Sequence, residues 1–183
     1  MLKIVTTPNN ILTQPAKPVL KIDEKIIKLI SDMEETLVAQ KDPEGVGLAA
    51  PQVEVDLSIF IIKPTPDDEV EVFVNPKIIK QETLSSKPKI ATKKGKKESK
   101  VKLEGCLSIP KIWGPIKRAE KILLEYENIK GEKKSEWFEG FKATIIQHEV
   151  DHLQGVLFTQ RSVEQNKPIY EEKGEELVKI TQF

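Results

Sequence analysis

The two histidines of this chain, His148 and His152, are four positions apart, and Glu149 directly follows the first of them. On an α-helix, residues with this spacing lie about 6 Å apart along the axis and about 40° apart around it, so both imidazoles can reach one metal ion. Glu149 lies too far around the helix to be a natural third ligand, but its carboxylate can reach a water molecule bound to that ion. The spacing therefore predicts a divalent metal site with a carboxylate placed for acid–base chemistry.

A third ligand is needed, because a catalytic ion usually keeps three protein ligands and one open position for water. No histidine follows His152, and the acidic residues beyond it lie in a charged terminal segment. The single cysteine, Cys106, lies in the strand-like stretch EGCLSIP, where Gly105 allows close approach of the backbone. We therefore predict Cys106 as the third ligand. A thiolate beside two imidazoles favours Fe(II), Zn(II), Co(II) or Ni(II) over magnesium or calcium.

The stretch GVGLAAPQ, Gly45 to Gln52, is rich in small residues. Small side chains let a peptide approach the main chain, so backbone groups near Val46 and Gly47 are candidates for pairing with a substrate as an added strand. A tight buried loop, in which the small residues only permit packing, is the alternative interpretation.

Three stretches, in this order, resemble peptide deformylase: GVGLAAPQ, EGCLS (Glu104 to Ser108) and QHEVDHLQG (Gln147 to Gly155). The resemblance covers most of the first 158 residues. It implies a metallohydrolase that removes the formyl group from the N-terminal formylmethionine of newly made polypeptides and releases formate. It also implies that water bound to the ion attacks the formyl carbon, with Glu149 as general base and then general acid, and that Fe(II) is the native ion.

The same resemblance assigns roles outside the metal site. The side-chain amide of Gln52 and the backbone N–H of Leu107 are expected to stabilise the negative charge that develops on the formyl oxygen. Many relatives carry an arginine shortly after the cysteine segment that helps to hold substrate, whereas Trp113 stands near that point here. Those contacts to the peptide backbone are therefore not predicted.

A pocket for the methionine side chain is implied close to the metal. Val46, Phe141 and Ile145 are candidates for its walls, since Phe141 and Ile145 precede His148 by seven and three positions on the same side of a helix. Ordinary core packing is the alternative explanation of these apolar residues.

Hydrophobic periodicity predicts the elements that must position these groups. One helix is expected over Glu24–Gln40, with Asp23 as its N-cap. A second is expected over Phe138–Leu153 and carries both histidines. A short third helix is expected near Tyr170–Ile180. Strands are expected over Leu57–Lys63, Glu71–Pro76, Lys102–Pro110 and Lys121–Asn128. The resemblance implies an α+β fold with antiparallel β-sheets packed around the central metal-binding helix.

The composition fits one soluble catalytic domain over residues 1–183, with 38% hydrophobic and 32% charged residues. Lys plus Arg equals Asp plus Glu, so no overall charge favours DNA or a membrane as a partner. There is no signal-like apolar start and no run of about 18 apolar residues. We expect a cytoplasmic protein whose partners are N-formylmethionyl nascent peptides.

One segment departs from this balance. Residues 87–102 contain eight lysines and a single acid, Glu98, and so carry a net charge of +7. A solvated loop or insertion explains this composition, and an arm that makes transient contact with ribosomal RNA is the alternative. The short terminal segment over residues 161–183 has four basic and five acidic groups, which does not support a ribosome contact there.

Two other functions fit some of these residues. An endopeptidase with the same His-Glu-x-x-His pattern would cleave internal peptide bonds, but the EGCLS stretch and the lack of a downstream histidine argue against it. A noncatalytic module would hold a structural ion or bind nascent chains without hydrolysis. Structural sites normally use four protein ligands, and the presence of both Glu149 and Gln52 fits catalysis better.

Overall fold

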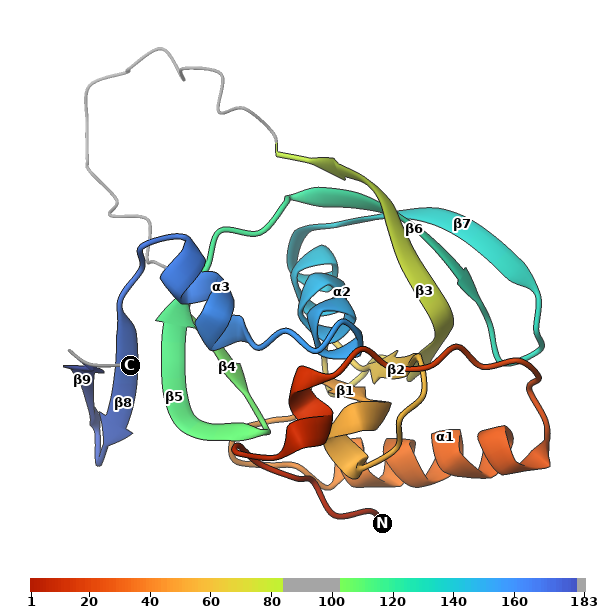
Figure 1. The fold of residues 1–183 in the computed structure, drawn as a ribbon, viewed down its shortest axis with the longest axis horizontal. Coiled ribbons are helices and arrows are strands. Elements are labelled where there is room, and N and C mark those ends of the chain that lie inside the picture. The colour runs from red at the N-terminus through yellow and green to blue at the C-terminus, as the bar shows by residue number, and fades with distance from the viewer. Residues whose placement is uncertain (84–102, 181–183) are drawn as a thin grey trace.

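The computed structural model describes residues 1–83 and 103–180 (Figure 1). The lysine-rich segment at 87–102 lies outside the described residues. In chain order the elements are η1 (Asn10–Thr13), α1 (Glu24–Val38), β1 (Gly47–Ala49), η2 (Ala50–Val53), β2 (Ile59–Ile62), β3 (Glu71–Glu82), β4 (Leu103–Cys106), β5 (Ile109–Pro115), β6 (Lys121–Glu127), β7 (Lys133–Glu139), α2 (Gly140–Leu153), α3 (Phe158–Glu164), β8 (Ile169–Lys173) and β9 (Glu176–Ile180).

The described strands form two antiparallel sheets. One has the order β1-β2-β3-β6-β7 and the other the order β4-β5-β8-β9. Figure 1 shows α2 between the arch of β3, β6 and β7 and the smaller sheet with α3. The predicted α+β fold, with antiparallel sheets around a central helix, is confirmed.

Helix α2 is buried on most of its circumference, which explains why its sequence is not simply amphipathic. Its apolar residues pack against the inner face of the five-stranded sheet in one cluster that includes Phe60, Phe73, Ile122, Leu124, Ile145, Ile146, Val150 and Leu153. Its polar residues Gln147, Glu149, Asp151 and His152 are buried as well. Buried polar groups need partners or a function, so this helix is where a site is expected.

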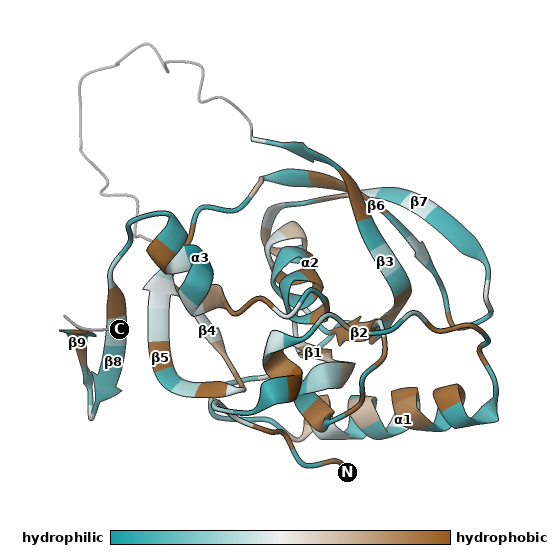
Figure 2. Ribbon diagram, viewed as in Figure 1, coloured by the Kyte–Doolittle hydropathy of each residue, from teal (hydrophilic) through white to brown (hydrophobic). Residues whose placement is uncertain are grey.

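Helix α1 begins at Glu24 as its sequence predicts, but it ends at Val38, two residues before the predicted end at Gln40. The Asp23 carboxylate accepts hydrogen bonds from the backbone N–H groups of Lys25 and Ile26, which caps the first turn. Figure 2 shows hydrophobic residues recurring along this helix between hydrophilic ones. The apolar face, including Met33 and Leu37, closes a second cluster with β1 and β2. Among the described residues, no helix has the length and apolarity needed to cross a membrane.

The predicted start of α2 and one predicted helix are wrong. Phe138 belongs to β7, where it pairs with Ile122, because the β6–β7 ladder continues to Glu139. Helix α2 begins only at Gly140, whose φ of 65° turns the chain from strand into helix. The segment near Tyr170–Ile180 is the hairpin β8–β9 and not a short helix.

Two strand predictions also need correction. The strand that begins at Glu71 does not stop at Pro76 but runs to Glu82 as β3, with an irregularity near Asn75. The amide of Asn75 holds this point by bonding both backbone groups of Val19, at 2.8 and 2.9 Å. The segment predicted as one strand over Lys102–Pro110 contains a tight turn, so it supplies β4 and the start of β5.

Candidate metal centre and active site

The thiol of Cys106 and the imidazoles of His148 and His152 converge on one point, with ligand atoms all within 4.8 Å of one another. Cys106 ends β4, and both histidines project from α2. The Cys106 sulfur lies 3.1 Å from Nε2 of His152. The fold therefore brings the three predicted ligands together, although Cys106 and the two histidines are more than 40 residues apart in sequence.

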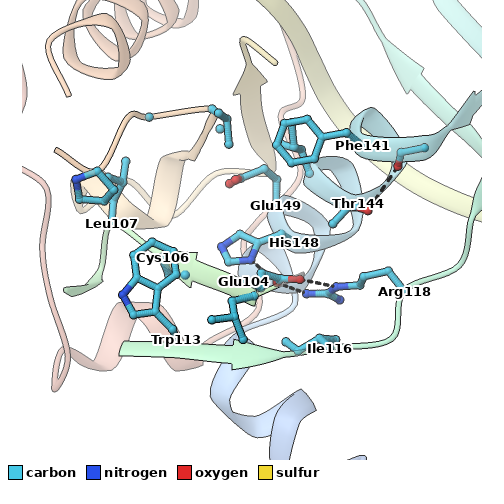
Figure 3. A pocket seen from close by; sticks show the side chains of 18 of the residues that line it. Glu104, Cys106, Leu107, Trp113, Ile116, Arg118, Phe141, Thr144, His148 and Glu149 are labelled. Atoms are coloured by element: carbon cyan, nitrogen blue, oxygen red, sulfur yellow. Dashed lines mark hydrogen bonds and ion pairs between the residues drawn. The ribbon is translucent and has the colours of Figure 1, made fainter. Parts of the chain in front are cut away.

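These three donors fit a transition-metal ion. One sulfur and two imidazole nitrogens form a donor set that suits Zn(II), Fe(II), Co(II) or Ni(II). Nδ1 of His148 is 2.6 Å from the Glu104 carboxylate, which leaves Nε2 of this ring free to face the cluster (Figure 3). A carboxylate on the far nitrogen is the usual device that orients a metal-binding histidine.

The electrostatics of the cluster favour the ligating form of the cysteine. Burial raises the pKa of the Cys106 thiol, but His152 and His148 outweigh this effect and lower the pKa to about 5. For His148, burial lowers the pKa, but Cys106 and Glu104 outweigh this effect and raise the pKa well above its ordinary value. The site thus stabilises a thiolate with positive charge beside it, and a cation can replace the protons on the imidazoles.

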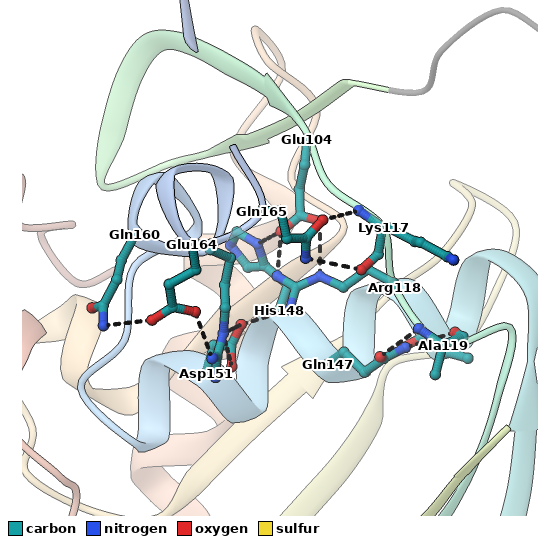
Figure 4. A network of polar contacts seen from close by, with 12 residues as sticks. Glu104, Lys117, Arg118, Ala119, Gln147, His148, Asp151, Gln160, Glu164 and Gln165 are labelled. Carbon is teal, nitrogen blue, oxygen red and sulfur yellow. Dashed lines mark hydrogen bonds and ion pairs between the residues drawn. The ribbon is translucent and has the colours of Figure 1, made fainter. Parts of the chain in front are cut away.

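Behind His148 lies a charged network whose members Glu104, Arg118 and Arg161 the sequence did not single out (Figure 4). Arg118 donates to both oxygens of Glu104, at 2.6 and 3.1 Å, and to Asp151 at 2.6 Å. Arg161 donates to the other side of Asp151 at 2.7 Å. Burial raises the pKa of Glu104, but His148 and Arg118 lower it to about 2. The network therefore keeps Glu104 ionised and holds the His148 ring in place.

Glu149 lines the cavity next to His148 (Figure 3). Its Oε2 atom is buried and has no hydrogen-bond partner among the described residues. Burial raises the pKa of Glu149 to about 7, which suits a group that exchanges a proton at neutral pH. A Cβ added to Gly47 would overlap the Glu149 carboxylate, so the glycine makes room for this side chain.

Gln52 is held with its amide group toward the cluster. Its Oε1 atom accepts a hydrogen bond from the backbone N–H of Ala49 at 2.9 Å, which fixes the orientation of the amide. Its Nε2 atom donates to the Ser108 hydroxyl at 3.1 Å and lies 3.6 Å from the Cys106 sulfur. Leu107 lies in the turn between β4 and β5 and lines the same cavity.

The cavity has a volume of about 1090 Å³ and runs from the cluster to the surface. All four residues predicted to bind substrate line this cavity: Val46, Gly47, Phe141 and Ile145. Phe141 is 49% exposed, as a pocket wall can be, whereas Ile145 is 4% exposed and also belongs to the core. Ile145 therefore packs in the core and also borders the cavity. His152 lies behind this lining, at 1% exposure.

Metal-dependent amide hydrolysis needs a cluster of soft donors, an acid–base group beside it and room for a substrate. All three are found together here on an α+β scaffold. Fold and site thus define the chain as belonging to the class of metal-dependent hydrolases.

Comparisons with known proteins narrow this class. The family model for polypeptide deformylase matches residues 1–168. Peptide deformylase 1 of Bacillus cereus is 37% identical over 161 residues, which cover 88% of this chain and 92% of that relative. The crystal structure of peptide deformylase from Thermotoga maritima is 36% identical, with a TM-score of 0.72, and covers 88% of this chain and 97% of its own. A class I type b peptide deformylase from Acinetobacter baumannii, crystallised with Met-Ala-Ser, is 32% identical, with a TM-score of 0.72, and covers 88% and 98%.

This chain therefore belongs to the polypeptide deformylase family, and it is an enzyme of that metal-dependent kind.

Proposed function

We propose that this enzyme removes the formyl group from the N-terminal formylmethionine of nascent peptides and releases formate. The observation that carries the proposal is the convergence of Cys106, His148 and His152 at the end of an open cavity that Glu149 also lines. The relative from Acinetobacter baumannii with bound Met-Ala-Ser supports the choice of substrate, since Met-Ala-Ser is the peptide left after deformylation of formyl-Met-Ala-Ser.

Cys106 Sγ and the Nε2 atoms of His148 and His152 would hold the metal ion. When bound, a divalent cation acts as a Lewis acid that lowers the pKa of a water molecule and polarises the formyl carbonyl. Fe(II) is our proposal for the native ion, and Zn(II), Ni(II) and Co(II) suit the same donors. Glu104 and Arg118 keep the His148 ring oriented toward the cation.

Glu149 manages the proton. As general base it accepts a proton from the water that attacks the formyl carbon, and as general acid it gives that proton to the methionine nitrogen when the carbon–nitrogen bond breaks. A buried carboxyl with a pKa near 7 can do both at neutral pH. The absence of any other hydrogen-bond partner for Oε2 among the described residues leaves this atom free for the water.

Gln52 and Leu107 stabilise the negative charge that develops on the formyl oxygen. The Gln52 NH2 group is neutral and pre-oriented by Ala49, so it donates without a reorganisation cost during the reaction. The backbone N–H of Leu107 is the second donor.

Val46, Phe141 and Ile145 form the pocket for the methionine side chain. The peptide backbone pairs with the chain near Val46 and Gly47. Strand β1, which begins at Gly47, is the edge of its sheet and so has one side available for an added strand.

The test is formate release from formyl-Met-Ala-Ser by protein prepared without oxygen and loaded in turn with Fe(II), Ni(II) and Zn(II). Turnover with at least one of these ions is expected. No formate with any ion would favour a noncatalytic binding module. Cleavage of an internal peptide bond, detected by mass spectrometry, would favour an endopeptidase.

Two further predictions stay at the level of sequence. A transient ribosome contact through residues 87–102 concerns a segment outside the described part of the chain. A cytoplasmic location is proposed from the substrate, since nascent chains carry the formyl group where they are made.

A further inference from the structure

Trp113 is a partly exposed aromatic residue on β5 that lines the cavity. Its indole N–H donates a hydrogen bond of 2.8 Å to the Glu172 carboxylate. Glu172 belongs to β8, the first strand of the hairpin β8–β9, and β5 pairs with β8 at Trp113 and Tyr170. This hairpin begins at Ile169, just beyond the residues that the family model matches.

The other side of the indole rests on Gly105. A Cβ at position 105 would lie 2.7 Å from Cζ3 of Trp113, so the ring lies directly over the residue before Cys106. The ring is therefore held at two points, by van der Waals contact with β4 and by a hydrogen bond to β8. Such a side chain offers a rigid apolar surface one residue away from the metal cluster.

We propose that Trp113 is a specificity-determining residue for the peptide side chain that follows formylmethionine, and that the C-terminal hairpin positions its indole through Glu172. The inference rests on the proposed deformylase function, since it adds a contact within the same cavity. It assigns to the hairpin a part in substrate choice.

The geometry of an extended peptide leads to this assignment. The formyl group must lie at the metal cluster, and the methionine side chain is proposed to enter the wall that contains Phe141. Successive side chains of an extended strand point to opposite sides, and each residue advances the chain by about 3.3 Å. Figure 3 shows Phe141 and Trp113 on opposite sides of His148. The side chain after methionine then faces Trp113, whose ring favours apolar and aromatic groups.

The first test compares formyl-Met-Phe-Ser, formyl-Met-Ala-Ser and formyl-Met-Asp-Ser as substrates of the metal-loaded enzyme. Aromatic packing predicts that kcat/KM for the Phe peptide exceeds that for the Ala peptide by about two- to tenfold. In Trp113→Ala this ratio should fall to about one, mainly through a higher KM for the Phe peptide. Trp113→Phe should keep part of the preference.

Variants of Glu172 separate position from mere presence of the ring. Glu172→Ala removes the hydrogen bond and should reduce the preference, whereas Glu172→Gln keeps a side-chain oxygen as acceptor and should retain it. Trp137→Ala is the matched control, because Trp137 is an exposed tryptophan on β7 that lies outside the cavity lining. This control should leave the ratio unchanged.

A binding measurement gives a readout independent of turnover. The chain has two tryptophans, so Trp137→Phe leaves Trp113 as the only one. Met-Phe-Ser should change its fluorescence and bind more tightly than Met-Ala-Ser. If the enzyme releases formate but Trp113→Ala and the parent discriminate equally, the inference is wrong and the proposed function stands. If no formate is released by the parent, the proposed function fails, and the fluorescence titration still decides whether Trp113 contacts the peptide.

Discussion

Gly47 and Glu149 occupy adjoining space so closely that any side chain at position 47 would displace the Glu149 carboxylate. Gly47→Ala should therefore lower kcat for formyl-Met-Ala-Ser by at least about tenfold, since acid–base catalysis contributes about 100- to 10,000-fold. Metal content should stay at the parental level because the ligands are untouched. If this variant is folded, as judged by circular dichroism, and has the parental kcat, catalysis does not require the Glu149 carboxylate to lie beside residue 47.

Glu149→Ala removes the proposed base without removing a ligand. We expect about a 100- to 10,000-fold loss of kcat with one metal ion still bound per chain. Formate release and elemental analysis of the same sample measure both quantities. Turnover at the parental rate would contradict the assignment of Glu149 as the base.

Cys106→Ala should abolish tight metal binding, since two imidazoles alone rarely hold a divalent ion against a chelator. Competition with a fluorescent chelator measures the affinity. Cys106→Ser is the control closest in size. Because its hydroxyl oxygen is a harder and weaker ligand than a thiolate, its metal affinity should be well below that of the parent. Unchanged affinity in both variants would place the ion elsewhere.

Arg118→Ala should destabilise the protein, because it leaves Glu104 and Asp151 buried without their shared partner. Loss of one member of a buried ion pair costs about 3–5 kcal/mol of the free energy of unfolding. Arg161 is the natural comparison: its side chain is 32% exposed, against 9% for Arg118, so Arg161→Ala should cost less. Urea denaturation of both variants tests the order, and equal losses would contradict it.

The proposed metal ligands could be picked out from the sequence because their residue types and spacing are a local signal. A helical spacing of four brings His148 and His152 together wherever the helix lies, and a chain with one cysteine offers one soft third donor. The Glu104 to His148 contact left no such trace, since its partners are 44 residues apart and either could have been a surface residue. Only the fold reveals that Glu104 on β4 faces His148 on α2.

The errors have a common physical origin in tertiary pairing. Phe138 fits the helical pattern of α2, but it pairs with β6 as part of β7. These cross-strand contacts set the boundary between β7 and α2. In the terminal segment, Gly174 takes a φ of 63°, which makes a tight hairpin turn possible, and β5 provides an edge on which β8 can pair. Neither the pairing of β7 with β6 nor the pairing of β8 with β5 can be read from the sequence.

The two parts of the proposed ligand set belong to different hydrophobic clusters. Cys106 packs with Ile109 and Phe158 in a small cluster of its own, whereas α2 is rooted in the large one beneath the five-stranded sheet. A bound cation would thus act as a cross-link between two separately packed units. Removal of the ion should speed hydrogen exchange across the four-stranded sheet more than across β2 and β3, so that cofactor loss is first felt as loosening of the wall that carries the sulfur.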